Sequence, residues 1–266
     1  MKELNFRAKD LSMLIDFLKI FEVVDSNLLL EINPDLTAVV KSYTVARTAV
    51  KYNIINLCEC FELTDNKQCP TEKIKIGLYH VKNFLNILKK FITVDNTYII
   101  FNYEANNEGE FVAKTIILQS TDRTVIHGCA QLGLFKYMPD DVINQVFDTS
   151  SSYLEFKLSS KVLKSVIEDS KDEACTDVYI KTAKIDDSSY IIFEGKNYST
   201  RYKTEIKFIK ELNYNCLITK EYLKYLDKNE DYTVFITESS VIFNSLLSNT
   251  KISFGRCNYE EEEVEC

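Results

Sequence analysis

Residues that could carry out catalysis are few and scattered in this chain. Its 266 residues contain no Gly-rich phosphate loop, no Gly-x-Ser-x-Gly elbow and no His-rich metal motif. The acidic pairs Asp140-Asp141 and Asp186-Asp187 occur in turn-like sequence, where carboxylates are usually solvated. Cys58, Cys60 and Cys69 form a loose group, but no fourth ligand lies near them at zinc spacing. The sequence therefore predicts no enzyme, no metal site and no cofactor.

Lysine is the residue type whose placement carries information. Four segments (residues 9–21, 80–91, 159–171 and 219–228) combine an apolar helical stripe with lysines on another face. In the last segment Lys220, Lys224 and Lys228 are spaced i, i+4, i+8, which predicts one helix face. Ser159 or Ser160 and Thr219 are predicted caps. A repeated design of this kind fixes the architecture before any other feature.

Positive charge is concentrated in these four segments. They hold eleven lysines and six acidic residues, a net charge of +5, while the whole chain carries −8 and the remainder therefore −13. A lysine opposite an apolar stripe is usually only a solvated side chain, and that reading stays open for any single helix. Four such helices in an acidic chain favour a shared anionic ligand. DNA phosphate fits, because lysine contacts with it are electrostatic and independent of base sequence.

Runs rich in Ile, Val, Tyr, Phe and Thr separate the helices and predict strands. They are residues 27–32, 37–42, 47–53, 73–78, 97–104, 111–119, 153–158, 177–183, 189–194, 202–208, 213–218, 232–237, 241–245 and 251–256. Residues 106–109 predict a hairpin turn between two of them. The chain thus consists of four units of helix plus antiparallel strands, two in each half.

The predicted domains follow from this rhythm and from the chain's length. They are an N-terminal domain (1–128), a connector (129–152), a C-terminal domain (153–258) and an acidic tail (259–266). The connector carries Leu132, Leu134, Phe135, Tyr137 and Met138. These side chains either pack on their own sheets or contact a partner.

The predicted location is the cytoplasm (the host cytoplasm for a phage protein) or the nucleus. No segment approaches the roughly 20 apolar residues of a membrane span, and the N-terminus lacks an apolar signal core. We therefore expect a protein that is neither secreted nor membrane-bound. The eight scattered cysteines fit a reducing compartment.

The order of elements resembles the DNA sliding clamps, the family of proliferating cell nuclear antigen and the tailed-phage polymerase clamps. Residues 42–48 resemble the loop and strand that flank the clamp partner pocket. Residues 75–89, 95–101 and 156–164 resemble clamp segments at the second helix, the strand after it and the entry to the third helix. Low Gly and abundant Asn and Lys favour a viral or phage member.

The resemblance implies an α+β DNA clamp fold with two similar domains, each with two short helices on antiparallel sheets. Three chains would close a ring through edge strands near residues 111–119 and 177–183. The helices would line the hole. The implied function is a non-enzymatic sliding clamp that encircles duplex DNA and acts as a DNA polymerase processivity factor. The implied partners are a polymerase, other proteins with clamp-binding peptides, and a clamp loader.

Two groups of site residues follow. The predicted DNA-facing residues are Lys9, Lys19, Lys82, Lys89, Lys90, Lys161, Lys164, Lys220, Lys224 and Lys228. The predicted partner-binding residues are Val45, Leu132, Leu134, Tyr137, Met138 and Tyr259. Two alternatives remain open: a monomeric or dimeric processivity factor with an open basic face, and a transcription or interaction scaffold that does not encircle DNA.

Overall fold

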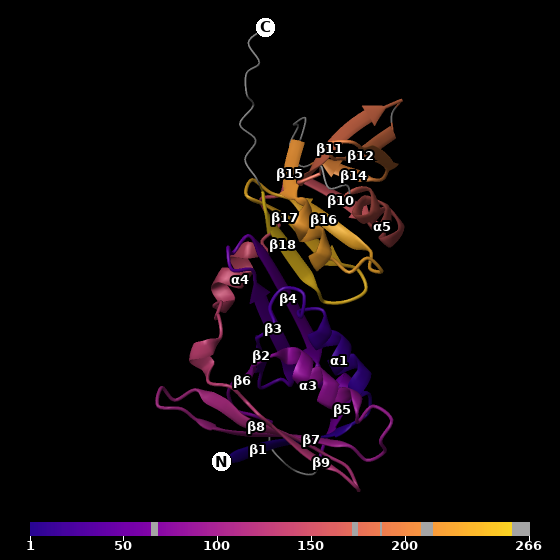
Figure 1. The fold of residues 1–266 in the computed structure, drawn as a ribbon. Helices are drawn as coiled ribbons and strands as arrows, with labels where there is room; N and C mark the ends of the chain where they lie inside the picture. The colour runs from indigo at the N-terminus through magenta and orange to yellow at the C-terminus, as the bar shows by residue number, and fades with distance from the viewer. Residues whose placement is uncertain (65–68, 172–174, 187, 209–214, 257–266) are drawn as a thin grey trace. The chain divides into compact units, whose positions relative to one another are not determined.

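The computed structural model describes the chain except for residues 65–68, 172–174, 187, 209–214 and 257–266 (Figure 1). The chain divides into two compact units. The first unit comprises Met1–Thr44 and Lys51–Pro139, and the second comprises Val45–Val50 and Asp140–Cys266. The predicted tail and Tyr259 lie outside the described residues.

The first unit is built on one sheet with the strand order β3-β2-β6-β8-β7-β1-β5, with β9 paired to β8. These strands are β1 (Lys2–Ala8), β2 (Leu28–Ile32), β3 (Thr37–Tyr43), β5 (Phe61–Leu63), β6 (Ile74–Leu78), β7 (Tyr98–Ala105), β8 (Phe111–Gln119) and β9 (Thr124–Gly128). Strand β4 (Ala49–Asn56) leads the chain from the second unit back into the first. The predicted hairpin is confirmed, because β7 and β8 pair around a turn in which Gly109 has φ 84°.

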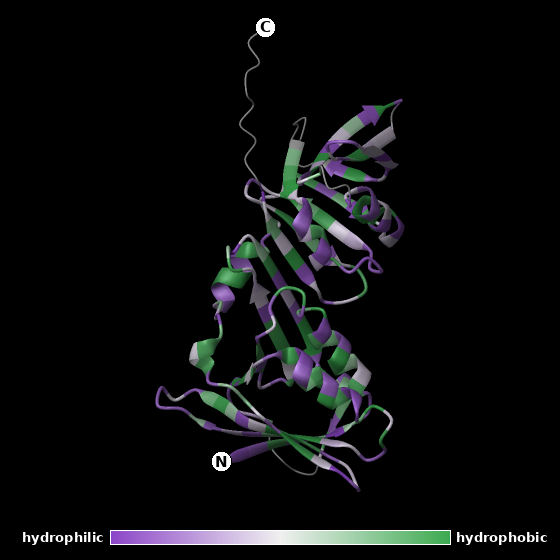
Figure 2. Cartoon of the chain, viewed as in Figure 1, coloured by the Kyte–Doolittle hydropathy of each residue, from purple (hydrophilic) through white to green (hydrophobic). Residues whose placement is uncertain are grey.

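Two α-helices, α1 (Leu11–Lys19) and α3 (Val81–Lys89), pack side by side in this unit (Figure 1). Asp10 caps α1 by accepting a hydrogen bond from Ser12 N. The apolar stripes of both helices are buried together with the strand side chains, and hydrophilic residues occupy the rest of each helix (Figure 2). A one-turn helix, α2 (Leu57–Cys60), precedes β5.

The second unit contains two sheets, ordered β14-β10-β16-β17-β18 and β13-β12-β11-β15. The strands are β10 (Leu154–Leu158), β11 (Asp177–Ile185), β12 (Ser188–Glu194), β13 (Ser199–Lys203), β14 (Ile206–Phe208), β15 (Asn215–Thr219), β16 (Tyr232–Ile236), β17 (Ser240–Ser245) and β18 (Lys251–Gly255). Its helices are α4 (Asp140–Val146), α5 (Ser160–Asp169) and the 3₁₀ helix η2 (Lys220–Tyr225). Tyr232, Phe243 and Phe254 form part of its core.

The first three predicted helices are confirmed as α1, α3 and α5, and Ser159 caps α5 through Val162 N. The fourth is a 3₁₀ helix, and the side chain of Thr219 does not cap it. Tyr222 and Tyr225 both lie against Phe254, with ring centroids 5.2 and 6.5 Å away. Residues three apart eclipse one another in a 3₁₀ helix, so this geometry brings both rings to one partner.

Several elements differ from the prediction. The predicted strand at residues 202–208 is divided between β13 and β14, and β1, β5 and β9 were missed. The pair Asp140-Asp141 begins α4 instead of lying in a turn, since carboxylates in a first turn favour a helix. A three-residue 3₁₀ turn, η1 (Leu132–Leu134), lies earlier in the connector.

The predicted interface strands were wrong in one respect, because neither is an edge. Strand β8 pairs with β7 on one side and with β6 and β9 on the other. Strand β11 pairs with β12 and β15. The edge strand beside β8 is β9, and the outer strands of the sheet that contains β11 are β13 and β15.

Candidate nucleic-acid interface and partner site

The exposed lysines of the first unit lie on or next to its two packed helices. Lys19, Lys82, Lys89 and Lys90 are exposed. Lys9, also exposed, precedes α1, and its Nζ donates a hydrogen bond to Cys58 O at 3.0 Å. Lys19 and Lys89 occupy last turns, where a cation favours the helix itself through the macrodipole. Their positions therefore have a structural explanation without DNA.

The helix macrodipole does not explain the positions of Lys82 and Lys161. Each is the second residue of its helix, α3 and α5, and neither first turn contains an acidic residue. A cation at this end of a helix opposes the macrodipole and costs about 0.3–1 kcal/mol. The two halves of the chain thus place an exposed lysine at the same unfavourable helix position. Lys164, one turn further along α5, is exposed as well.

The three lysines of the fourth segment do not share one face. Lys220 is half-buried, Lys224 lies 3.8 Å from the Glu221 carboxylate, and Lys228 follows the end of η2. With three residues per turn, positions four apart point in different directions. The predicted alignment at i, i+4, i+8 is therefore wrong for this segment.

The predicted partner-binding residues are distributed over both units. Val45 belongs to the second unit and is 89% exposed. Leu132, Leu134, Tyr137 and Met138 belong to the first; Leu134 is 65% exposed, Leu132 is half-buried and Met138 is buried. Met138 therefore offers little surface to a partner.

Connector residues 130–138 are docked onto the first unit. Ala130 N donates to Gly77 O at 2.9 Å, and Phe135 packs against the Gly77 backbone. Two ammonium groups lie over the ring of Tyr137, Lys75 Nζ at 4.5 Å and Lys41 Nζ at 5.6 Å from its centroid. The connector is held by backbone, packing and cation–π contacts together.

A buried ion pair supports the same attachment. Lys41 Nζ lies 2.7 Å from the Glu31 carboxylate and also donates to Met138 O at 3.4 Å. Glu31 is 2% exposed, and Lys73 approaches its carboxylate at 3.4 Å. Removing one partner of a buried ion pair leaves the other charge poorly compensated. Through its contact with Met138 O, Lys41 therefore connects residues 130–138 to the buried carboxylate of Glu31.

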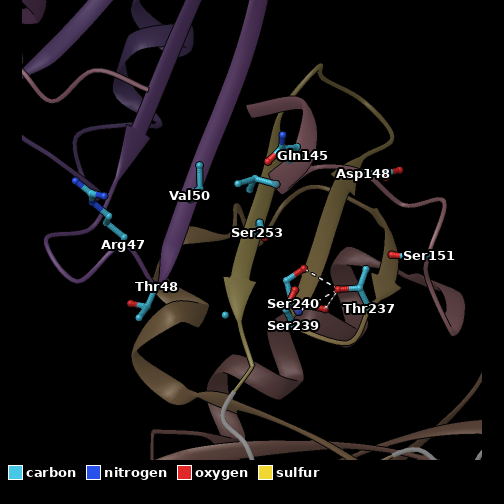
Figure 3. Close-up of a pocket in the computed structure, with 12 residues that line it drawn as sticks. Arg47, Thr48, Val50, Gln145, Asp148, Ser151, Thr237, Ser239, Ser240 and Ser253 are labelled. Atoms are coloured by element: carbon cyan, nitrogen blue, oxygen red, sulfur yellow. Dashed lines mark hydrogen bonds between the residues drawn. The ribbon is translucent and has the colours of Figure 1, made fainter. Parts of the chain in front are cut away.

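The second unit has a polar cavity of about 310 Å³ that the sequence analysis missed (Figure 3). It is lined by the end of α4, by the turn between β16 and β17, by β18 and by Arg47 and Thr48. Thr237 and Ser253 contribute buried hydroxyl groups, and Thr237 Oγ1 lies 2.9 Å from Ser240 Oγ. The serines and threonine of residues 237–240 were the sequence signal for it, but they are equally typical of an ordinary turn.

The charged groups of this cavity are Arg47 and Asp148. Hydrogen bonds from the backbone and then the side chain of Ser150 hold the pKa of Asp148 below its ordinary value. Asp148 is therefore ionised at neutral pH, and its negative charge balances the positive charge of Arg47 in the lining of the cavity. The lining offers mainly hydroxyl and amide groups to a ligand.

Side chains that could bind a metal ion are not clustered in the part of the chain that the structure describes. Within that part, no three His, Cys, Asp or Glu side chains are grouped to hold a metal ion. Burial raises the pKa of both Cys60 and Cys129 to about 12, so neither is a thiolate at neutral pH. No helix in the described part of the chain is long and apolar enough to cross a membrane.

Comparison with solved structures identifies a protein of similar architecture. The crystal structure of Proliferating Cellular Nuclear Antigen from Entamoeba histolytica matches with a TM-score of 0.66 and 12% sequence identity. The match covers 96% of this chain and 99% of that chain. No family model and no curated protein matches the chain by sequence. The predicted fold class, an α+β DNA clamp fold, is confirmed.

Proposed function

We propose that this protein is a sliding clamp that encircles duplex DNA and serves as a polymerase processivity factor. The observation that carries the proposal is the matched pair Lys82 and Lys161, placed in the two halves where helix stability disfavours a cation. An external anion compensates such a cost. The clamp fold provides a topological reason for that anion to be DNA.

Encirclement would keep the protein on DNA without tight contacts. Exposed lysines on α1, α3 and α5 would screen phosphate repulsion, and no base edge needs to be read. The acidic remainder of the chain would repel DNA from other surfaces. The bound ring would stay mobile along the duplex.

Ring closure would use the edge strands β9 and β13, one from each unit. Each has five residues and pairs on one side within the described chain, β9 with β8 and β13 with β12. Ile126 on β9 is 65% exposed and lies on the strand that a second copy would pair with. Because the two edges differ, pairing between copies would be head-to-tail, which gives a ring where the rotation between copies closes. We propose three copies, since each chain supplies two clamp-like units.

Partner peptides would dock beside the connector. Leu134 offers an exposed apolar side chain on the docked segment. A polymerase and a clamp loader are the proposed partners. Leu132, Tyr137, Val45 and Tyr259 remain candidate contacts.

Retention on DNA tests the proposed function. The protein, loaded on nicked circular DNA by a clamp loader, should stay bound during gel filtration and dissociate after linearisation. The double variant Lys82→Glu/Lys161→Glu should lose DNA association and polymerase stimulation. The matched control Lys114→Glu/Lys251→Glu changes the net charge equally at positions outside the helices and should retain both. A stable monomer at micromolar concentration in sedimentation would contradict the ring.

A further inference from the structure

A second polar cavity, of about 360 Å³, lies at one end of the helix pair in the first unit. Three segments enclose it: the end of β1, the residues that begin α1, and the loop after α3. Arg7 and Lys9 contribute two cations, and Asp95 is the one acidic residue of the lining. The helix pattern that selected the lysines excluded Arg7, because it belongs to a strand.

The wall of this cavity is fixed by hydrogen bonds. Ala8 N donates to Thr97 O at 2.8 Å, and Arg7 Nη2 donates to Asn96 Oδ1 at 2.8 Å. Asn96 adopts a left-handed backbone conformation with φ 53°, which asparagine tolerates better than most residues. Arg7 is thus held at the cavity by one of its five N–H groups, with four left for other acceptors.

The local charge favours an anion. Lys9 Nζ uses one of its donors on Cys58 O, and the Asp10 carboxylate is turned to Ser12 as the cap of α1. The Arg123 guanidinium lies 5.5 Å from the ring centroid of Phe91, which lines the cavity, and the exposed Lys90 directly precedes Phe91. Two basic groups, Arg7 and Lys9, therefore line the cavity against the single carboxylate of Asp95, and Arg123 contacts Phe91, one of the lining residues.

We infer that this cavity binds a phosphate group of the duplex backbone. A guanidinium fork and an ammonium group match the oxygens of phosphate in charge and geometry. The exposed helix lysines act as a diffuse field, whereas Arg7 is positioned in a walled site. The inference rests on the proposed function in naming DNA as the source of the phosphate. Asp95 limits the affinity, which suits a contact that must release as the protein slides.

Binding to a short linear duplex tests the inference without ring closure. In Arg7→Gln, the affinity for a 30-bp duplex should fall several-fold at low salt, and the slope of log K against log salt should decrease by about 0.9. Asp95→Asn, in the exposed loop, should instead raise the affinity. Arg201→Gln is the matched control, since Arg201 stacks on Tyr190 in the second unit. Equal affinities and slopes in Arg7→Gln and Arg201→Gln would overturn the inference.

Inorganic phosphate separates the two sources of the ligand. Backbone amide NMR signals of residues 95–97 should shift on titration with phosphate, and less so in Arg7→Gln. If phosphate shifts them while Arg7→Gln leaves duplex binding unchanged, the cavity binds free oxyanions and the DNA assignment is wrong. Loss of retention on circular DNA with an intact Arg7 effect on the linear duplex would contradict encirclement alone.

Discussion

Gly77 is the residue at which the connector meets β6. A Cβ atom at this position would lie 2.5 Å from Ala130 O and 2.5 Å from a ring carbon of Phe135. The Phe135 ring could rotate. The carbonyl oxygen cannot move as easily, because it belongs to Ala130, whose N–H donates to Gly77 O in an antiparallel bridge. The absence of a side chain, rather than an unusual backbone angle, is what this position requires.

Gly77→Ala should therefore lower the free energy of unfolding by about 1–3 kcal/mol, because the connector must move to admit the methyl group. Urea denaturation measures the change. Gly133→Ala is the control, since a Cβ there meets nothing within 4 Å. Equal stabilities of the two variants would show that the connector is not docked on Gly77.

At the scale of elements, β9 carries a histidine, His127, that packs against α3. The strand has five residues, and Val125 packs against the core on the same face as His127. The His127 ring lies 5.0 Å from that of Phe84 on α3, and its Nε2 has no hydrogen-bond partner in the structure. Burial lowers the pKa of His127 below its ordinary value of 6.5.

This shift predicts that stability falls on acidification. Below about pH 6.5 the unfolded chain takes up a proton on His127 before the folded chain does, so the free energy of unfolding decreases as pH falls toward the folded-state pKa. His127→Gln should show a smaller loss over that interval. Carboxylates titrate mainly below about pH 5 and affect both proteins alike. Parallel stability curves from pH 7 to 5 would contradict the assignment.

The elements also show how far the sequence could be interpreted. Long apolar periods such as Leu11, Leu14, Ile15 and Leu18 predicted α1 correctly, and β-branched runs predicted most strands. The same periodicity predicted an α-helix where the structure has η2. The local side-chain pattern fits an α-helix, and the stacking of Tyr222 on Phe254 is a tertiary contact that the pattern does not contain. Strand β9 was not predicted, because Thr124–Gly128 is short and only alternate side chains, those of Val125 and His127, are partly buried.

The candidate sites were less accessible than the fold. Helix lysines could be selected by spacing, but Arg7 reaches the cavity of the first unit because β1 pairs with β7, a contact between distant segments. The hydroxyl-lined cavity gathers residues 47–48, 145–151, 237–240 and 253–255, which no local pattern connects. Sites of this kind depend on tertiary contacts between segments distant in sequence.

At the scale of the whole molecule, the two unlike edge strands of the proposed ring, β9 and β13, would give the assembly a direction. A C₂ dimer would join identical surfaces, whereas a β9–β13 contact joins unlike ones. Each chain would then use both edges in a ring, and neither edge would stay open. The direction of assembly can be tested by blocking one edge at a time.

Ile126→Pro on β9 and Lys203→Pro on β13 each remove a backbone donor that points to the open edge. Each variant alone should fail to form rings in sedimentation. Their equimolar mixture should form dimers through the one intact pair of edges, but no closed ring. Gln119→Pro, at the end of the paired strand β8, controls for general destabilisation. Rings in the mixture, or no dimers beyond those of the single variants, would contradict head-to-tail pairing.

The replacement of an α-helix by η2 reaches beyond that element. The first unit presents its lysines from two packed α-helices, whereas the second presents them from α5 and from a 3₁₀ segment whose lysines diverge. The two units therefore differ in how they present their lysines. In a ring of three copies, the electrostatic potential felt by the duplex would repeat three times per revolution rather than six. A sliding duplex would then face sectors of stronger and weaker positive potential in turn. The period of this variation around the ring would be one whole chain rather than one unit.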